Sequence, residues 1–410
     1  MRHKSSITKV LVVSLVALLV CSSVAHSAGS QNPVDSRLTT ANSKFSFKLY
    51  NELLKHRKGD KNTFVSPASV MLALAMTYNG TAGTTQQGMA RALELEGMSL
   101  GDVNRAFADL KSALASLDSK VQLRIANSLW VRNGFTLNPD FVARNKQHYA
   151  AEIANLNFDD PAATKTINSW VSKNTEGKID QIIEQINAGD VLFLINAIYF
   201  KGQWHFEFKK ENTKPDVFRL ASGEQKQLQM MSQSSTYLYY KGKDFQSVVL
   251  PYGTGRVSMY VFLPDEQKGL DQFEKDLTPE NWDTWMRSFR QNPGDLMFPR
   301  FKAEWESELI PALKALGMED AFNPTRADFS QMAKVSAGGL FISSVKHKSI
   351  CEVNEEGTVA AAATSVTATV TSVQEPREKF VMKVDRPFFF AIRDNFTGVL
   401  LFMGSITNPG

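Results

Sequence analysis

The chain has 410 residues, of which 43% are hydrophobic and 21% charged, and its formal net charge is +4. This balance is typical of a globular protein with a substantial core and argues against a low-complexity chain. No Pro/Gly/Ser-rich linker or internal repeat divides the sequence, so we predict one large domain over 29–410.

Residues 1–28 have the pattern of a secretory signal peptide. Basic residues at positions 2, 4 and 9 precede an apolar run, Val10 to Val20, that is too short to span a bilayer comfortably. The alternatives are a retained membrane anchor and a lipid attached at Cys21. Removing the segment takes away three basic residues and no acid, so the formal charge falls from +4 to +1. We therefore expect a secreted protein, extracellular or periplasmic, that binds neither nucleic acid nor a membrane.

Hydrophobic periodicity predicts helices and strands along the whole chain. The first helix, 43–55, ends in the basic cluster Lys55-His56-Arg57-Lys58, which we interpret as a solvated helix end, the alternative being a polyanion site. Further helices are predicted at 70–79, where a strand turns into a buried helix, and at 103–114, 138–149, 163–176 and 309–316. Strands are predicted at 123–131, 191–200, 247–250, 256–263, 296–302, 340–347 and 349–354, with a closing hairpin formed by 380–393 and 399–406.

The sequence contains no motif of an enzyme or of a metal site. Its six histidines form no His-Glu-x-x-His pattern, and no Gly-x-Ser-x-Gly elbow or phosphate-binding glycine loop occurs. Cys351 falls in a predicted apolar strand, so we interpret it as a small core side chain and not as a nucleophile. Because Cys21 leaves with the signal peptide, no internal disulfide can form. We predict no catalytic activity, no metal and no cofactor.

A segment near the C-terminus combines a glycine hinge with a long run of small residues. Glu355-Glu356-Gly357 ends a predicted strand and leads into Thr358–Thr371. Even positions from 358 to 370 are threonine, alanine or valine, and odd positions from 365 on are polar, which is the period-two pattern of a half-buried strand. The polar stretch Pro376-Arg377-Glu378-Lys379 is instead typical of an exposed loop. Both interpretations hold if the loop converts into a strand.

This hinge and four other motifs together resemble the serpin family. They cover essentially the whole chain after the signal peptide, in the family's order: Asn62-x-x-x-Ser66-Pro67, Asn196-Ala197-Ile198-Tyr199-Phe200-Lys201-Gly202-x-Trp204, Glu355-Glu356-Gly357-Thr358, Arg386-Pro387-Phe388, and Phe402-Met403-Gly404 with Asn408-Pro409. The resemblance implies an α+β fold with a large central, mostly antiparallel β-sheet, two further sheets, about eight or nine helices and an exposed reactive-centre loop at 357–379.

The resemblance also implies irreversible inhibition of serine proteases, and by extension of cysteine proteases. A protease attacks one bond of the loop and forms a covalent acyl-enzyme. The freed loop then inserts into the protein's own sheet before water completes the hydrolysis. As a strand, Thr358–Thr371 would extend roughly 45 Å, which is about the length of a domain. The native state must then be metastable and persist kinetically.

The family's pattern assigns roles to individual residues of this loop. The reactive bond is expected at Thr371-Ser372, where small and β-branched residues suit an elastase-like or subtilisin-like protease. Arg377 is the alternative for a trypsin-like enzyme. The resemblance assigns the loop hinge to Glu355, Glu356, Gly357, Thr358, Val359, Ala360, Ala361, Ala362 and Ala363. The small side chains among them would let the segment slide between two strands.

The resemblance also implies two polar clusters where the central sheet parts. The shutter cluster would lie under the sheet's centre and hold its strands shut; its members are Ser66, Ser69, Asn127, Asn196 and His347. The mouth cluster consists of Trp204, Arg300 and Glu355, and a partly buried Glu355–Arg300 pair there would restrain the hinge. Helix capping is the alternative role for Ser66 and Ser69. We expect a monomer that can polymerise when one molecule's loop inserts into another's sheet.

Two other functions stay open at this point. A non-inhibitory serpin serving as a carrier, storage or chaperone protein would share the fold, but cleavage of its loop would not raise its melting temperature. A secreted enzyme of unrelated mechanism would need a catalytic cluster that the sequence does not show. Asn79-Gly80-Thr81 and Asn395-Phe396-Thr397 match the glycosylation sequon.

Overall fold

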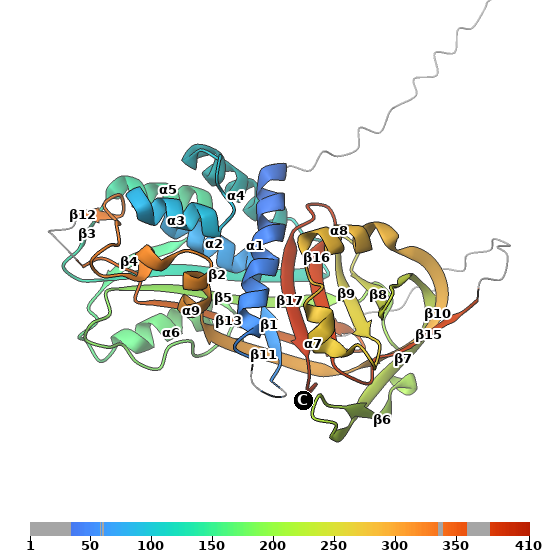
Figure 1. The fold of residues 1–410 in the computed structure, drawn as a ribbon. Helices are drawn as coiled ribbons and strands as arrows, with labels where there is room; N and C mark the ends of the chain where they lie inside the picture. Colours follow the sequence, from blue (N-terminus) through green and yellow to red (C-terminus); the bar gives the residue numbers. More distant parts are fainter. Residues whose placement is uncertain (1–33, 58, 60, 335–338, 359–377) are drawn as a thin grey trace, which may run out of the picture. The chain divides into compact units, whose positions relative to one another are not determined.

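The computed structural model describes residues 34–57, 59, 61–334, 339–358 and 378–410. These residues belong to one compact unit that contains a six-stranded sheet, a nine-stranded sheet, a two-stranded sheet and nine α-helices (Figure 1). The expected signal peptide, the hinge residues beyond Thr358 and the expected reactive bond lie outside the described residues.

The six-stranded sheet has the longest apolar strand of the sequence near its centre. Residues 192–200 of this strand, β5, are all buried, because helices and loops cover both faces of the sheet. The β13–β5 and β2–β4 pairs are parallel and the other pairs are antiparallel. The order is β11 (Phe301–Glu308), β13 (Ser344–Asn354), β14 (Gly357–Thr358), β5 (Leu192–Gln203), β2 (Val121–Arg132) and β4 (Glu152–Leu156).

The neighbouring strands β13 and β5 separate at one end of this sheet. They are paired in parallel from Ser344 opposite Phe193 to Ile350 opposite Tyr199. Beyond that point β14 lies between them and is antiparallel to both, with Thr358 opposite Val353 on one side and opposite Gly202 on the other. The sheet therefore opens by one strand width at this end, and the two residues of β14 occupy the opening.

The nine-stranded sheet joins the middle of the chain to its C-terminal hairpin. The turn of that hairpin is closed by the carbonyl oxygen of Asp394, which accepts the backbone N–H of Gly398 at 2.8 Å. The strand order is β1 (Thr63–Val65), β17 (Leu400–Ile406), β16 (Phe388–Asp394), β9 (Val257–Pro264), β8 (Phe245–Tyr252), β7 (Gln225–Lys241), β10 (Arg290–Pro299) and β15 (Phe380–Lys383), with β6 (Lys214–Arg219) paired to β7. The two-stranded sheet pairs β3 (Thr136–Leu137) with β12 (Ala333–Lys334).

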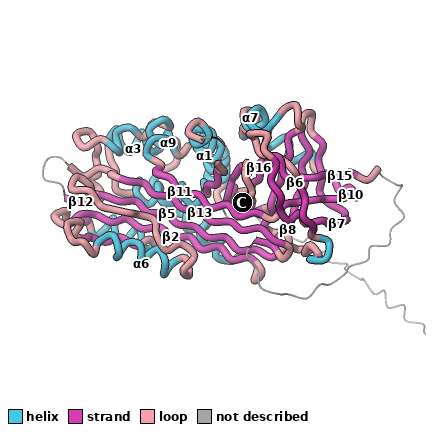
Figure 2. Tube along the Cα trace, turned by 90° about the horizontal axis from the view of Figure 1, so that it is seen from below, coloured by secondary structure: helices cyan, strands magenta, loops and turns pink. Residues whose placement is uncertain are grey.

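Helix α2 (Pro67–Tyr78) contacts strands of both large sheets, and every one of its residues is buried. Its sequence is apolar all round, as a helix enclosed on all sides requires. Helix α6 lies on one face of the six-stranded sheet, whereas α1, α3 and α9 lie on the opposite face (Figure 2). The other helices are α1 (Ser36–Leu54), α3 (Gly83–Ala92), α4 (Leu100–Ala115), α5 (Pro139–Tyr149), α6 (Ala163–Asn174), α7 (Gly269–Glu274), α8 (Pro279–Ser288) and α9 (Ile310–Ala315).

The predicted fold class is confirmed, but several predicted elements have the wrong bounds. The segments 340–347 and 349–354 were expected to be separate, yet β13 runs unbroken from Ser344 to Asn354. The polar residues His347 and Ser349 hide this strand from a hydrophobicity pattern, and both are buried because each has a hydrogen-bond partner. The predicted strand 296–302 contains a corner at Arg300, where β10 of one sheet ends and β11 of the other begins.

Two more predicted elements have the wrong bounds, and in both a proline marks the boundary. The segment 70–79 does not begin as a strand: the strand is β1, and Pro67 is the first residue of the helix that follows. The predicted strand 380–393 is interrupted before Phe388, after Pro387, and forms β15 and β16. Strand β7 was not predicted; its buried and exposed residues only roughly alternate, along a stretch rich in Gln and Ser.

Candidate functional site

The hinge begins inside the six-stranded sheet. Gly357 has φ +145°, and a side chain there would place its Cβ 2.1 Å from the carbonyl oxygen of Gly202. Glycine is therefore required at 357, both by this close approach to β5 and by the backbone conformation. Thr358 follows with its side chain fully buried, which fixes which face of a continued strand would point into the core.

Glu355, immediately before the hinge, is held by Arg300. The Arg300 Nε lies 2.8 Å from Oε1 and 2.9 Å from Oε2 of the carboxylate, and the Thr213 hydroxyl donates to Oε1 at 2.5 Å. Glu355 is only 2% exposed. Burial alone would raise its pKa, but the hydrogen bonds from Arg300 and Thr213 outweigh burial and hold the pKa below its ordinary value. The carboxylate is therefore charged at neutral pH.

Trp204 ties the end of β5 to the hinge. Its indole N–H donates to the carbonyl oxygen of Asn354 at 2.9 Å, and its backbone N–H donates to that of Glu356 at 2.9 Å. The indole stacks on Tyr252 with ring centroids 4.4 Å apart, and the Tyr252 hydroxyl is 2.8 Å from the Thr358 hydroxyl. The mouth cluster predicted from the sequence is thus brought together, and Tyr252 and Thr213 are members that sequence reasoning missed.

The five predicted residues of the shutter cluster also come together, where α2 meets β2, β5 and β13. His347 Nε2 lies 3.2 Å from the backbone nitrogen of Ser66, and His347 Nδ1 contacts Asn196 Oδ1. The Asn196 amide also reaches Asn127 Oδ1 at 2.5 Å and the carbonyl oxygen of Ser69 at 3.2 Å. Ser66 additionally caps α2, since its hydroxyl accepts the Ser69 N–H at 3.3 Å. Capping and strand closure are therefore compatible roles for Ser66.

The directions of the hydrogen bonds made by His347 and Asn196 follow from one fixed donor. The backbone N–H of Ser66 can only donate, so Nε2 of His347 accepts and the ring proton sits on Nδ1. Nδ1–H then donates to Asn196 Oδ1, which leaves the Asn196 NH₂ to donate to Ser69 and Asn127. Burial lowers the pKa of His347 to about 3, so the ring is neutral at neutral pH.

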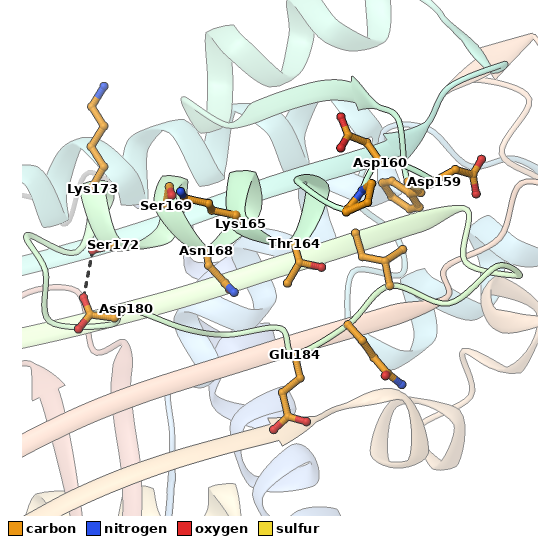
Figure 3. A pocket seen from close by; sticks show the side chains of 14 residues that line it. Asp159, Asp160, Thr164, Lys165, Asn168, Ser169, Ser172, Lys173, Asp180 and Glu184 are labelled. Carbon is orange, nitrogen blue, oxygen red and sulfur yellow. Dashed lines mark hydrogen bonds between the residues drawn. The ribbon is translucent and has the colours of Figure 1, made fainter.

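A loop covers the face of the sheet where β5 and β13 meet. Helix α6 precedes this loop and holds it through Asn168, whose Oδ1 accepts the N–H groups of Ile182 at 3.0 Å and Ile183 at 3.1 Å. Lys348 of β13 donates to the carbonyl oxygen of Gln181 at 3.0 Å. Between helix and loop lies a polar groove of about 1030 Å³, with the Ser172–Asp180 hydrogen bond at one side (Figure 3). A strand added between β5 and β13 would have to displace this loop.

The remaining candidate residues fall outside the clusters. Cys351 is buried, and burial raises the pKa of its thiol to about 12, which makes it the small core side chain predicted and removes any thiolate at neutral pH. Asn79 is 1% exposed and bonded to Asn104 at 2.9 Å, and the Asn395 side chain is hydrogen-bonded by four groups, so neither sequon presents a free amide. Val359, Ala360, Ala361, Ala362, Ala363, Thr371, Ser372 and Arg377 lie outside the described residues.

Metal-binding clusters and membrane-spanning helices are both absent from the described residues. No group of three or more His, Cys, Asp or Glu side chains among them is arranged to hold a metal ion. None of the helices in the part of the chain that the structure describes is long and apolar enough to cross a membrane.

Comparison with known proteins gives consistent matches over nearly the whole chain. A family model described as "Serpin (serine protease inhibitor)" matches residues 40–409. The leukocyte elastase inhibitor of Bos taurus is 37% identical over 385 residues, which covers 91% of this chain and 100% of the relative. The native thermophilic serpin tengpin is 33% identical with a TM-score of 0.84, covering 92% of this chain and 96% of that one. Thyroxine-binding globulin in complex with thyroxine is 26% identical with a TM-score of 0.81, covering 90% and 99%.

Proposed function

The chain belongs to the serpin family, and from this premise we propose that it is a suicide-substrate inhibitor of serine proteases. The observation that carries the proposal is the position of β14. Two residues of the hinge already form a strand between β13 and β5, antiparallel to both, at the point where these strands separate. Continuing β14 in the same direction would drive the loop down the line where β13 and β5 are paired.

Insertion would replace one strand pairing by two. The parallel β13–β5 pairing from Ser344 to Ile350 would be broken, and the new strand would pair antiparallel with each neighbour, as β14 does now. Antiparallel pairing is slightly more stable per residue than parallel pairing, and the loop's own backbone groups would gain partners. The native state would thus hold stored free energy that cleavage of the loop releases.

The covalent step belongs to the protease. Its serine hydroxyl would attack the Thr371 carbonyl carbon, the Thr371–Ser372 peptide bond would break, and the new amino group of Ser372 would leave with the transferred proton. An ester then joins Thr371 to the protease serine. Insertion of the segment from Thr358 onward would carry the attached enzyme roughly 45 Å before water hydrolyses the ester. This chain's contribution is the fast strand insertion and not any catalytic group.

We propose an elastase-like or subtilisin-like protease as the target. The β-branched residues Val370 and Thr371 before the expected bond suit a shallow apolar primary pocket. The name of the Bos taurus relative is compatible with an elastase-like target. Cleavage after Arg377 by a trypsin-like enzyme is the alternative, which would require several more residues to insert.

We also propose that residues 1–28 direct export and are removed. The support is their sequence pattern: basic residues, an apolar run and small residues suited to cleavage. Expression of the full chain with its leader, followed by N-terminal sequencing of the exported protein, tests this. A mature N-terminus near Gly29 is expected. Recovery of an uncleaved, membrane-bound product would contradict it.

The test of inhibition is a search for a covalent complex. The protein is incubated separately with pancreatic elastase, subtilisin and trypsin, boiled in detergent, and separated by size. We expect a complex with elastase or subtilisin, and a released C-terminal fragment beginning at Ser372 by mass spectrometry. Cleavage by all three enzymes without any complex, and without a rise in the melting temperature of the cleaved protein, would refute inhibition and leave the carrier function.

A further inference from the structure

A small apolar cavity lies beside the mouth cluster, with Trp204 as part of its wall. Its volume is about 320 Å³, at the lower end of the range for small-molecule sites. None of the side chains that line it is an acid, a lysine or an arginine. They come from the segment after β5, from β7, β8, β9 and β10, and from the β8–β9 and β16–β17 turns, and include Trp204, Phe206, Tyr237, Leu238, Val249 and Tyr260.

Two exposed apolar side chains gather at this cavity. Among the described residues, three large hydrophobic side chains are strongly exposed: Phe206 at 48%, Leu238 at 43% and Val381 at 58%. Phe206 and Leu238 both line the cavity, although they are far apart in the sequence. Exposed apolar side chains are unremarkable singly, but a pair beside an apolar hollow indicates a surface that a ligand would cover.

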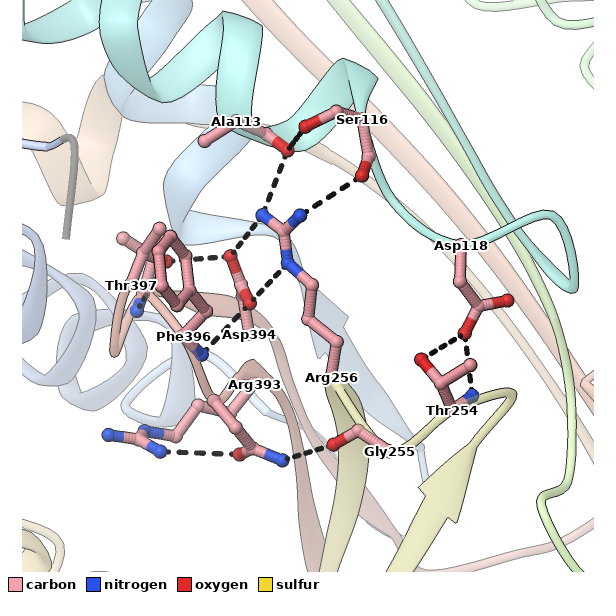
Figure 4. A network of polar contacts seen from close by, with 12 residues as sticks. Ala113, Ser116, Asp118, Thr254, Gly255, Arg256, Arg393, Asp394, Phe396 and Thr397 are labelled. Atoms are coloured by element: carbon pink, nitrogen blue, oxygen red, sulfur yellow. Dashed lines mark hydrogen bonds and ion pairs between the residues drawn. The ribbon is translucent and has the colours of Figure 1, made fainter. Parts of the chain in front are cut away.

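Hydrogen bonds tie together one wall of the cavity. Asn395 donates to the carbonyl oxygen of Gly255 at 3.0 Å and to the Ser258 hydroxyl at 2.9 Å, and its Oδ1 accepts the Tyr260 hydroxyl at 2.7 Å. Figure 4 shows the adjoining network, in which Arg256 binds the buried carboxylate of Asp394 and two carbonyl groups at the end of α4. A ligand would therefore bind a preformed cavity with little ordering of the protein.

We propose that this cavity binds a neutral aromatic small molecule and that its occupancy restrains the hinge through Trp204. The ligand class follows from the lining: aromatic and aliphatic groups favour a flat apolar molecule, and a charged one would lose its hydration without a counter-charge. The coupling follows from the two hydrogen bonds that join Trp204 to Asn354 and Glu356. The consequence for inhibition rests on the proposed function; the binding itself does not.

The binding is tested with N-phenyl-1-naphthylamine, an uncharged probe whose fluorescence rises in apolar surroundings. For a ligand of this size we expect a dissociation constant of about 10–300 µM. Leu238→Glu places a charge at the rim of the cavity and should weaken binding at least about tenfold. Val381→Glu is the matched control, since Val381 is equally apolar and even more exposed but does not line the cavity, and it should leave binding within about twofold of wild type.

The results of the binding experiment distinguish a ligand site at this cavity from the absence of one. Saturable binding that Leu238→Glu weakens and Val381→Glu does not would support the site. Absence of binding to the wild type, or equal binding by the two variants, would overturn it. Phe206→Ser changes another segment without adding a charge, and it should also weaken binding. Weaker binding in both variants would exclude a purely local effect of the new charge on β7.

The coupling is tested without any protease, so that its failure is distinct from a failure of the inhibitory function. The backbone N–H groups of Trp204 and Phe208 donate to the carbonyl oxygens of Glu356 and Glu355. We expect hydrogen exchange at these two amides to slow about fivefold or more when the probe is saturating. Unchanged exchange at both amides with the probe bound would overturn the coupling.

Discussion

The mouth cluster and the shutter cluster both join β13 to β5, but they do so with different chemistry. At the mouth, a buried carboxylate, Glu355, meets an arginine whose side chain is 43% exposed. At the shutter, His347 is fully buried and its hydrogen-bond partners are neutral. A charged pair beside solvent is partly screened, whereas a buried neutral network leaves desolvated groups unpaired when one member is lost. We therefore expect the sheet to be held more strongly at its centre than at its mouth.

The largest effect should come from blocking the strand insertion that we propose. Thr358 is buried, so in a strand that continued β14 alternation would place the side chain of position 362 on the core face and that of position 359 on the opposite face. Ala362→Arg would bury a guanidinium without a partner and should slow insertion by at least about a hundredfold. The elastase reaction should then yield cleaved protein instead of covalent complex on a denaturing gel.

The matched control for this change is Val359→Arg. It adds the same charge three residues earlier, on the face where the neighbouring residues of an inserted strand would be the exposed Glu352 and the partly exposed Lys201, and it should form complex nearly as well as wild type. Equal loss of complex in both variants would show that the charge disturbs recognition by the protease. Equal retention in both would show that the loop does not continue β14 in this register.

The second effect in size concerns the centre of the sheet. His347→Ala removes the acceptor of the Ser66 N–H and the donor to Asn196 Oδ1, and leaves both groups buried. The native state should lose about 2–5 kcal/mol, with faster spontaneous conversion or polymerisation on mild heating. Urea unfolding and native gels measure this. His56→Ala, at an exposed helix end, is the control and should change stability by less than about 0.5 kcal/mol.

Part of the two clusters could be predicted from the sequence, because the chain resembles a known family at several of their key residues. Asn196 and Gly357 fall in the family's motifs, whereas the strand that carries His347 is hidden from a hydrophobicity pattern by its polar residues. The residues that were missed, Tyr252 and Thr213, contact the hinge from distant segments. No periodicity in their own segments indicates such a contact, since it depends on how the two sheets pack.

Arg300 illustrates the same limit in the element bounds. Its pairing with Glu355 was expected, but the strand predicted through it was not continuous, because Arg300 occupies the corner at which the chain leaves one sheet for the other. A corner between sheets has the same apolar flanks as an unbroken strand. The backbone N–H of Arg300 bonds to the carbonyl oxygen of Gln229, a partner on β7 that the sequence could not supply.

A smaller effect is expected at the mouth. Glu355→Lys removes the carboxylate and places a second cation beside Arg300, so the hinge is released from Arg300. Position 355 is buried, but the lysine ammonium can reach solvent beside the partly exposed Arg300 side chain, so we expect a loss of about 1–3 kcal/mol. Polymers on a native gel after mild heating are the readout.

Glu356→Lys is the matched control at the mouth. Glu356 pairs with Lys210, whose side chain is 68% exposed, and such a surface pair contributes little to stability. This variant should stay monomeric under the conditions that polymerise Glu355→Lys. If both variants polymerise equally, the added positive charge near the hinge would be responsible, and the Arg300 pair would not be the restraint.

The smallest effect is the pH dependence of the unfolding free energy that comes from His347, about 1.4 kcal/mol per pH unit. A charged cluster would be expected to weaken first in acid, but here the neutral shutter cluster does. The unfolded chain protonates His347 near its ordinary pKa of 6.5, whereas the native state keeps the ring neutral down to about 3. Between these values the unfolded state binds one more proton, so stability falls as the pH is lowered. The pKa of Glu355 is below the ordinary 4.5, so its contribution is complete above that pH and is lost only on further acidification. From pH 6.5 to 5.0 the shutter cluster should therefore weaken alone.

The variant that isolates this effect is His347→Gln. The groups around His347 are uncharged: Ser66, Asn196 and the Trp305 ring, whose centroid is 5.8 Å away. A glutamine amide offers one donor and one acceptor and does not titrate. Urea unfolding at pH 6.5 and 5.0 should show wild type losing about 1.6 kcal/mol more than the variant, because the unfolded chain is already half protonated at pH 6.5. Equal losses would mean that acid acts elsewhere, and that the neutral centre of the sheet is no more sensitive to protons than its charged mouth.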